Sequence, residues 1–318
     1  LVRSALKIGV TFNNMFGKNT MKGFTGFFRR FFPEMPLWSD QLHYPPDLSV
    51  LTSPPTSKVR TLEVRTLEVR TLEVGTLEVG VVYFPSCISR TLGSYEGKTK
   101  NLMETFMSVC NKSGIPVSIL KDAVGSCCSQ IYSSKGFNDA YRYTANKIVE
   151  QLWSSSKKGQ LPVVIDVSSC AYTLHQIRPI LDESHKQQYD QLKIMDAVEF
   201  LHDMVMPRAT VKTKQQHVVL HPVCSLQKMK TEEKFVNLAR HFAENVTVPV
   251  NAGCCGMAGD RGFLIPELTA SATHPEATEV ARNKFDGYYS STKTCEMAMS
   301  EAVKENYESI LYLVDEAI

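Results

Sequence analysis

This chain of 318 residues lacks several features that define common classes of protein. No apolar run approaches the roughly 18 to 20 residues that a membrane-spanning helix requires. The formal charge is only +2, and lysine and arginine are spread along the chain instead of forming the basic face that nucleic-acid binding needs. The N-terminus has no signal-peptide pattern. We therefore expect a cytoplasmic globular protein without a nucleic-acid partner.

Common catalytic and metal-binding motifs are also absent. The sequence contains no glycine-rich phosphate loop and no Ser-His-Asp or Cys-His arrangement of a nucleophilic enzyme. Structural zinc sites usually use cysteines two to four residues apart, and bacterial ferredoxins use C-x2-C-x2-C, but neither spacing occurs here. Nine cysteines, an odd number, argue against a secreted disulfide framework and favour metal or redox use in a reducing compartment.

The chain divides into four predicted segments. Residues 1–50 are predicted to be helical and then aromatic, with Phe24, Phe27, Phe28, Phe31 and Phe32. We expect these aromatic side chains to pack on a neighbouring part of the same protein; the alternative is contact with a membrane or partner. Because the chain starts at Leu1 within an amphipathic pattern, we expect a fragment that begins in the tail of an upstream domain. Residues 51–80, proline-rich and then repeating RTLEV, are predicted to be a linker, because a five-residue period matches neither helix nor strand.

From Gly80 onward, short β-branched runs alternate with helical ones, which predicts an α/β fold. We expect two similar domains with parallel-type sheets, residues 81–205 and 206–318. The predicted strands are 80–85, 115–120, 161–167, 217–222 and 246–250. The predicted helices are 98–114, 137–155, 232–245, most of 274–291, and 300–318.

The cysteines repeat between these two halves. VVYFPSC (81–87) matches VVLHPVC (218–224), and VSILKDAVGSCC (117–128) matches VTVPVNAGCC (246–255). Each half carries one cysteine, then an adjacent pair, then one more. The eight are Cys87, Cys127, Cys128 and Cys170 in the first half, and Cys224, Cys254, Cys255 and Cys295 in the second. Adjacent cysteines are too close for an ordinary disulfide, so each pair needs another partner.

Each of these cysteines follows a predicted strand, so four thiolates from three loops are expected to meet at the carboxyl edge of a parallel sheet. Soft thiolates select iron–sulfur clusters, zinc or copper(I). The widely separated pattern favours a multi-metal cluster over a single tetrahedral ion. The ninth cysteine, Cys110, lies on the apolar face of a predicted helix and is expected in the core.

The pattern resembles the cysteine-rich CCG domain, found twice in the catalytic subunit of heterodisulfide reductase and in the iron–sulfur parts of glycolate oxidase and FAD-linked D-lactate dehydrogenase. The resemblance is closer to the last. It is carried by FPSCISRTLG, GSCCSQIYSSKGF, DVSSCAYTL, HPVCSLQKM, NAGCCGMAGDRGF and GYYSSTKTCEMAMS, and it covers about residues 1–50 and 80–318.

This resemblance implies one iron–sulfur cluster, of 4Fe-4S type, on the four cysteines of each half. In heterodisulfide reductase the pattern ends in CxxC and supplies a fifth thiolate, whereas Thr173 and Ala298 stand at those positions here. The resemblance further implies an oxidoreductase in which a flavin (FAD) domain, absent from this chain, oxidises D-lactate to pyruvate. Electrons would then pass to a cytochrome or quinone, with at most peripheral contact at the inner membrane.

Two alternatives stay open: a disulfide reductase like heterodisulfide reductase, or a glycolate oxidase iron–sulfur subunit. A third alternative is a non-redox zinc protein, and the absence of the usual zinc spacing argues against it.

Four further residues are candidates near the cysteines. Arg90 would offset thiolate charge or be solvated, and His221 is interpreted as a core histidine in preference to a ligand. Asp260 and Arg261 would contact a cluster or an acidic partner, or else start a helix with a buried ion pair.

Overall fold

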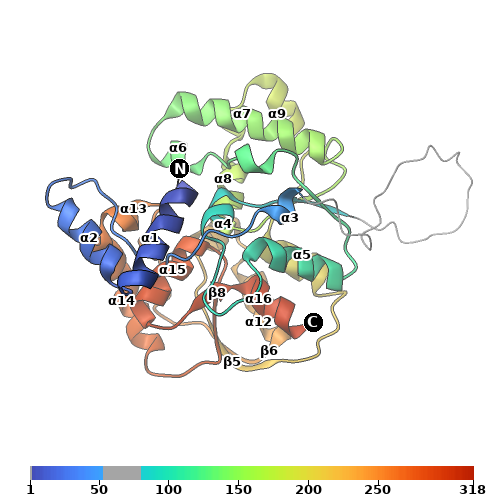
Figure 1. The fold of residues 1–318 in the computed structure, drawn as a ribbon. Coiled ribbons are helices and arrows are strands. Elements are labelled where there is room, and N and C mark those ends of the chain that lie inside the picture. The colour runs from blue at the N-terminus through green and yellow to red at the C-terminus, as the bar shows by residue number, and fades with distance from the viewer. Residues whose placement is uncertain (1, 53–79) are drawn as a thin grey trace, which may run out of the picture.

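The computed structural model describes residues 2–52 and 80–318 (Figure 1). The RTLEV repeat, and with it most of the predicted linker, lies outside the described residues. The N-terminal segment contains α1 (Val2–Phe16), α2 (Thr20–Arg29) and α3 (Ser49–Thr52).

Residues 81–205, the first half, form a four-stranded parallel sheet in the order β2-β1-β3-β4. Its strands are β1 (Val81–Phe84), β2 (Val117–Ile119), β3 (Val163–Ile165) and β4 (Ile194–Asp196). Its helices are α4 (Cys87–Leu92), α5 (Leu102–Lys112), η1 (Ala123–Gly125), α6 (Gln130–Ser134), α7 (Asn138–Ser155), α8 (Ser168–Gln176), η2 (Arg178–Ile180), α9 (Glu183–Tyr189), α10 (Ala197–Phe200) and η3 (Leu201–Val205).

Residues 206–318, the second half, repeat this topology as β6-β5-β7-β8, again all parallel. The strands are β5 (Gln215–Leu220), β6 (Ala243–Thr247), β7 (Gly287–Ser290) and β8 (Tyr307–Ser309). The helices are α11 (Cys224–Met229), α12 (Glu232–Phe242), α13 (Arg261–Leu264), α14 (Pro266–Val280), α15 (Lys293–Val303) and α16 (Ile310–Ala317). The α/β prediction with parallel sheets is therefore confirmed.

Three predicted helices were partly wrong. The end of the helix expected over 232–245 belongs to β6, which begins at Ala243. Residues 287–290, expected within a helix, form β7, which pairs with β5 and β8 in the sheet. The final predicted helix, 300–318, is interrupted by β8. The strands β7 and β8 are only three or four residues long and largely buried, so they show no alternation of polar and apolar side chains.

Helices of both halves fill the space between the two sheets. Alternate residues of β1 point to opposite faces: Val81 and Tyr83 join a core shared with the second half, whereas Val82 and Phe84 face the opposite side of the sheet. The shared core contains side chains of α5 and α10 from the first half and of α12 and α16 from the second. Helices of the two halves contact each other in this core: α5 packs on α16, and α10 packs on α12. Both sheets are therefore held in one continuous apolar core.

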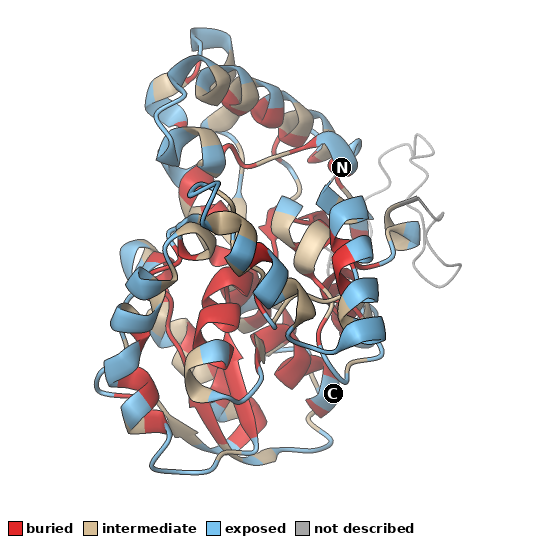
Figure 2. Ribbon diagram, turned by 60° about the vertical axis from the view of Figure 1, so that its left-hand side comes forward, coloured by how far each residue is buried: buried red, intermediate tan, exposed pale blue. Residues whose placement is uncertain are grey.

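The N-terminal segment packs against both halves. Arg3 donates to the backbone carbonyls of Arg90 and Pro46, and Arg29 donates to the carbonyl of Leu264. In Figure 2 this segment shows mostly exposed and intermediate residues, in contrast to the buried strands. Of the predicted aromatic residues, Phe24, Phe27, Phe31 and Phe32 are exposed, and Phe28 is partly buried. In the part of the chain that the structure describes, no helix is both long and apolar enough to cross a membrane.

Candidate metal centres

The first group of four thiols forms at the carboxyl edge of the first sheet. Cys87 begins α4 directly after β1, Cys127 and Cys128 lie in the loop after β2, and Cys170 lies on α8 after β3. The Cys127 thiol interacts with those of Cys87 and Cys128, and Cys128 interacts in turn with Cys170. The structure thus brings together all four predicted cysteines of this half, which we call the first cysteine cluster. Cys110 lies elsewhere, fully buried in the shared core as predicted.

The surroundings favour one ionised sulfur in the first cluster, that of Cys127, whereas the hydrogen bonds to Cys127 and burial raise the pKa values of Cys87 and Cys128. The Ser129 amide donates to the Cys127 sulfur at 3.3 Å. Hydrogen bonds from the thiols of Cys128 and Cys87 lower the pKa of Cys127 well below its usual value. Because thiolates, not thiols, bind metals, Cys127 is prepared for coordination before its neighbours.

Arg90 anchors the loop that carries the adjacent cysteine pair. Its side chain is buried, and its guanidinium donates to the backbone carbonyls of Val124 and Ser126, directly before Cys127. The positive charge also lies near the thiols of the first cluster. Of the two predicted roles, charge compensation near the thiolates fits this burial, and surface solvation does not.

Asp166 was not singled out from the sequence, yet it fixes the start of α4. Its carboxylate is fully buried at the end of β3 and accepts the Ser86 amide at 2.9 Å and the Tyr83 hydroxyl at 2.6 Å. Ser86 caps α4 by accepting the Ser89 amide, so Asp166 positions the residue that precedes Cys87. The available signal was an acidic residue that ends an apolar strand, in VVIDVSSC.

The second half repeats this arrangement. Cys224 begins α11 after β5, Cys254 and Cys255 follow β6, and Cys295 lies on α15 after β7. The sulfur atoms of Cys255 and Cys295 are 2.8 Å apart. Burial raises the pKa of Cys224, Cys254 and Cys255 lie near enough for their charge to raise it further, and we call these four residues the second cysteine cluster. In both clusters the outer cysteines, Cys87, Cys224 and Cys254, are exposed, whereas Cys128, Cys170, Cys255 and Cys295 are buried.

Gly256 shapes the loop of the second cluster. Its φ is +73°, a left-handed conformation that glycine adopts without strain, and its amide lies 3.5 Å from the Cys254 sulfur. A Cβ atom here would come within 2.9 Å of the Leu268 carbonyl oxygen. Glycine at this position therefore allows the cysteine loop to pack directly on α14.

His221 and Glu276 form a buried pair beside the second cluster. The His221 Nδ1 lies 2.9 and 2.8 Å from the two carboxylate oxygens of Glu276, and both side chains are almost fully buried. A ring nitrogen of His221 and the sulfurs of Cys255 and Cys295 all lie within 4.8 Å of one another. Burial lowers the pKa of His221, but interactions with Cys255 and Glu276 outweigh it and raise the value to about 9. His221 is buried, as predicted, but it also contacts the cysteines; Glu276 gave no sequence signal.

Asp260 and Arg261 do not meet the cysteines. Asp260 forms an ion pair with Lys135 at 3.0 Å, and both side chains are substantially exposed. Arg261 begins the short helix α13. Of the predicted roles, the helix start and the ion pair are present, but the ion pair lies on the surface instead of being buried.

The helices that carry cysteines pack across the interface between the halves. The helix that begins at Cys87, α4, contacts α15, and α11, which begins at Cys224, contacts α8. Across the same interface, the hydroxyl oxygens of Ser168 and Ser291 lie 2.9 Å apart, and the Lys228 ammonium lies 5.1 Å from the centre of the Tyr172 ring. Both clusters therefore border the same interface.

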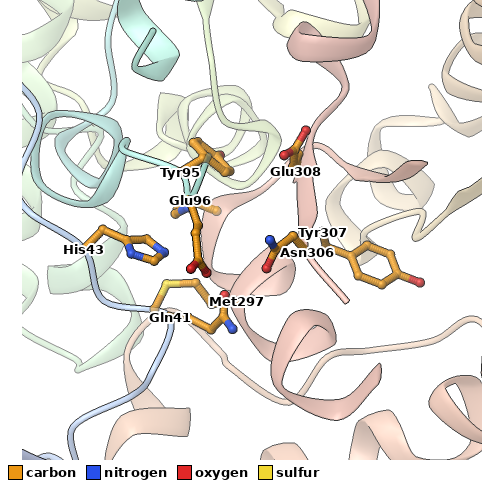
Figure 3. A pocket seen from close by; sticks show the side chains of 9 residues that line it. Gln41, His43, Tyr95, Glu96, Met297, Asn306, Tyr307 and Glu308 are labelled. Atoms are coloured by element: carbon orange, nitrogen blue, oxygen red, sulfur yellow. The ribbon is translucent and has the colours of Figure 1, made fainter. Parts of the chain in front are cut away.

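Three buried polar side chains, those of Lys293, Tyr95 and Glu296, lie at this interface, next to Cys295. Lys293 places its ammonium 3.3 Å from the centre of the Tyr95 ring, and Tyr95 donates a hydrogen bond to Glu296. Burial lowers the pKa of Lys293 to about 8 and raises the pKa of Glu296 to about 7. Figure 3 shows the adjoining small pocket, where Gln41 and His43 of the N-terminal segment meet residues of both halves. Three parts of the chain thus meet beside the second cluster.

The donor sets fit a soft metal centre. Each half offers four thiols on one sheet edge, partly ionised and approached by backbone amides, and neither Thr173 nor Ala298 adds a further sulfur. The Thr173 hydroxyl donates to the Ser169 carbonyl within α8.

Part of the first half matches the model of a known protein family. Residues 81–175 match the family model of the CCG cysteine-rich domain. Over 222 residues, the chain is 23% identical to a component of the anaerobic glycerol-3-phosphate dehydrogenase of Escherichia coli K12, and equally to its counterpart from Escherichia coli O157:H7. The match covers 68% of this chain and 55% of each relative, so the chain spans about half the length of the curated relatives it matches. The first half is thus similar to the CCG cysteine-rich domain, and the chain is similar to one component of a dehydrogenase.

Proposed function

We propose that this chain is the iron–sulfur electron-transfer part of a FAD-linked dehydrogenase. The observation that carries the proposal is the pair of four-thiol clusters, each built at a parallel sheet edge and joined by packing of their cysteine-bearing helices. The ligands would be Cys87, Cys127, Cys128 and Cys170 in the first half, and Cys224, Cys254, Cys255 and Cys295 in the second. A bound 4Fe-4S cluster would accept and release single electrons.

The residues around the thiols support this role by controlling charge. Arg90 holds a cation beside the first cluster, which offsets part of the negative charge of a thiolate-bound centre. The amides of Ser129 and Gly256 donate to sulfur, and such hydrogen bonds tune the potential of iron–sulfur centres. The exposed edges at Cys87 and Cys254 leave each cluster accessible to a redox partner.

We propose a flavin dehydrogenase domain as the electron donor and a cytochrome or quinone as the acceptor. D-lactate, oxidised to pyruvate, is the substrate that the sequence motifs favour. Glycerol 3-phosphate is the second candidate, because the relatives from Escherichia coli are named for it. A disulfide reductase is disfavoured by Thr173 and Ala298, which leave each cluster without the fifth thiolate of that family.

Anaerobic preparation of the chain tests the proposal. We expect a brown protein with about four iron and four sulfide per cluster and an electron paramagnetic resonance signal on reduction or oxidation. Cys128→Ser and Cys255→Ser should each remove one centre, whereas Cys110→Ala, outside both clusters, should leave the iron content unchanged. A colourless protein that holds one zinc per cluster would refute the proposal. A signal that responds to an added disulfide substrate would favour the reductase.

A further inference from the structure

The two halves differ at one buried position next to their cysteines. In the matching stretches VVYFPSC and VVLHPVC, Phe84 of the first half corresponds to His221 of the second. Phe84 is fully buried in an apolar cluster that includes Cys128 and Cys170. His221 is equally buried but brings a ring with two polar nitrogens to the second cluster.

The two nitrogens of His221 have different surroundings. Nδ1 meets the Glu276 carboxylate, which is also 3.4 Å from the Gly253 amide at the start of the cysteine loop. Nε2 is buried and has no hydrogen-bond partner among the residues that the structure describes. A buried polar atom without a hydrogen-bond partner is destabilising, so a partner for Nε2 is expected.

The geometry matches that of metal-binding histidines in proteins. Such histidines almost always donate their other ring N–H to a carboxylate, a backbone carbonyl or a water, which fixes the tautomer and the ring orientation. Here Glu276 occupies that place, and the sulfurs of Cys255 and Cys295 lie within 4.8 Å of a ring nitrogen. In the first half Phe84 takes the place of His221, and no described residue there brings a histidine nitrogen to the cysteines.

We infer that His221 Nε2 is an additional, nitrogen ligand of the metal centre in the second cysteine cluster, oriented by Glu276. The inference rests on the proposed function, because it assumes an iron–sulfur centre on these thiolates. The two centres are then chemically unequal, with only sulfur ligands in the first half and mixed nitrogen and sulfur ligands in the second.

Pulsed electron paramagnetic resonance on the anaerobic chain tests this inference without a substitution. With histidine selectively labelled by ¹⁵N, the second centre should show a strongly coupled histidine nitrogen. His221→Phe, which installs the residue of the first half, should abolish that coupling. His217→Phe is the matched control, since His217 lies on β5, the strand that ends directly before His221, but its ring contacts Thr247, and it should leave the coupling unchanged.

Glu276→Gln provides a second test if His221→Phe does not assemble its centre. Loss of such an orienting carboxylate typically lowers metal affinity about 10- to 100-fold, so a chelator should remove iron from the second centre more readily. Two full centres with no strongly coupled histidine nitrogen would overturn the inference and leave the proposed function intact. Absence of iron and sulfide from the whole chain would instead refute the proposed function.

Discussion

Asp196 makes the stability of this fold depend on pH. It is fully buried at the end of β4, where it accepts the Ser168 hydroxyl at 2.6 Å and the Glu199 amide at 2.8 Å. Burial disfavours the charged carboxylate and raises the pKa of Asp196 from 3.8 to about 6. Between these values the folded state holds a proton that the unfolded state has lost, so stability falls as the pH rises.

The magnitude follows from the two pKa values. Stability from this group is fully present below about pH 4 and is lost once the pH passes about 6, and the change from about pH 4.5 to 7 amounts to about 2 kcal/mol. Asn at position 196 keeps an oxygen that can cap α10 but carries no charge. Asp196→Asn should therefore gain stability relative to the wild type by about 2 kcal/mol more at about pH 7 than at about pH 4.5.

Anaerobic chemical denaturation of both proteins at the two pH values measures this difference. Asp190→Asn is a suitable control, because Asp190 is exposed and paired with Arg178 on the surface. If the difference between Asp196→Asn and the wild type is the same at both pH values, the buried carboxylate is not the group that titrates.

Three further predictions concern the surroundings of the clusters. Arg90→Met leaves the carbonyls of the first cysteine loop without their donor, so we expect a loss of about 1–3 kcal/mol in unfolding free energy and less iron in the first centre only. Gly256→Ala should cost about 1–3 kcal/mol and weaken the second centre, whereas Gly253→Ala, with nothing closer than 3.8 Å to the added Cβ, should change neither measurement. Lys293→Met removes the charge that lowers the pKa of the buried Glu296 and should reduce stability, while adding Glu296→Gln should recover part of this loss. Denaturation curves and iron analysis check all three, and full additivity of the last pair would contradict their coupling.

The sequence by itself determined the α/β class, five of the eight described strands, several of the longer helices, and the repeat of the eight cysteines. These features are local, because apolar runs, helix periodicity and the residues flanking each cysteine are visible within about 20 positions. The meeting of Cys87, Cys127, Cys128 and Cys170 also followed from the sequence, since parallel strands end at a common edge.

Only the tertiary structure decided what surrounds the thiols. His221 meets Glu276 across 55 positions, and Arg90 meets the carbonyl of Ser126 across 36. Neither pairing can be recognised from a local sequence pattern. β4, β7 and β8 escaped prediction because strands of three or four residues are specified by their partners in the sheet and not by their own periodicity. The clusters could thus be predicted from strand ends, whereas their charges and the inequality of the two halves arise from long-range packing.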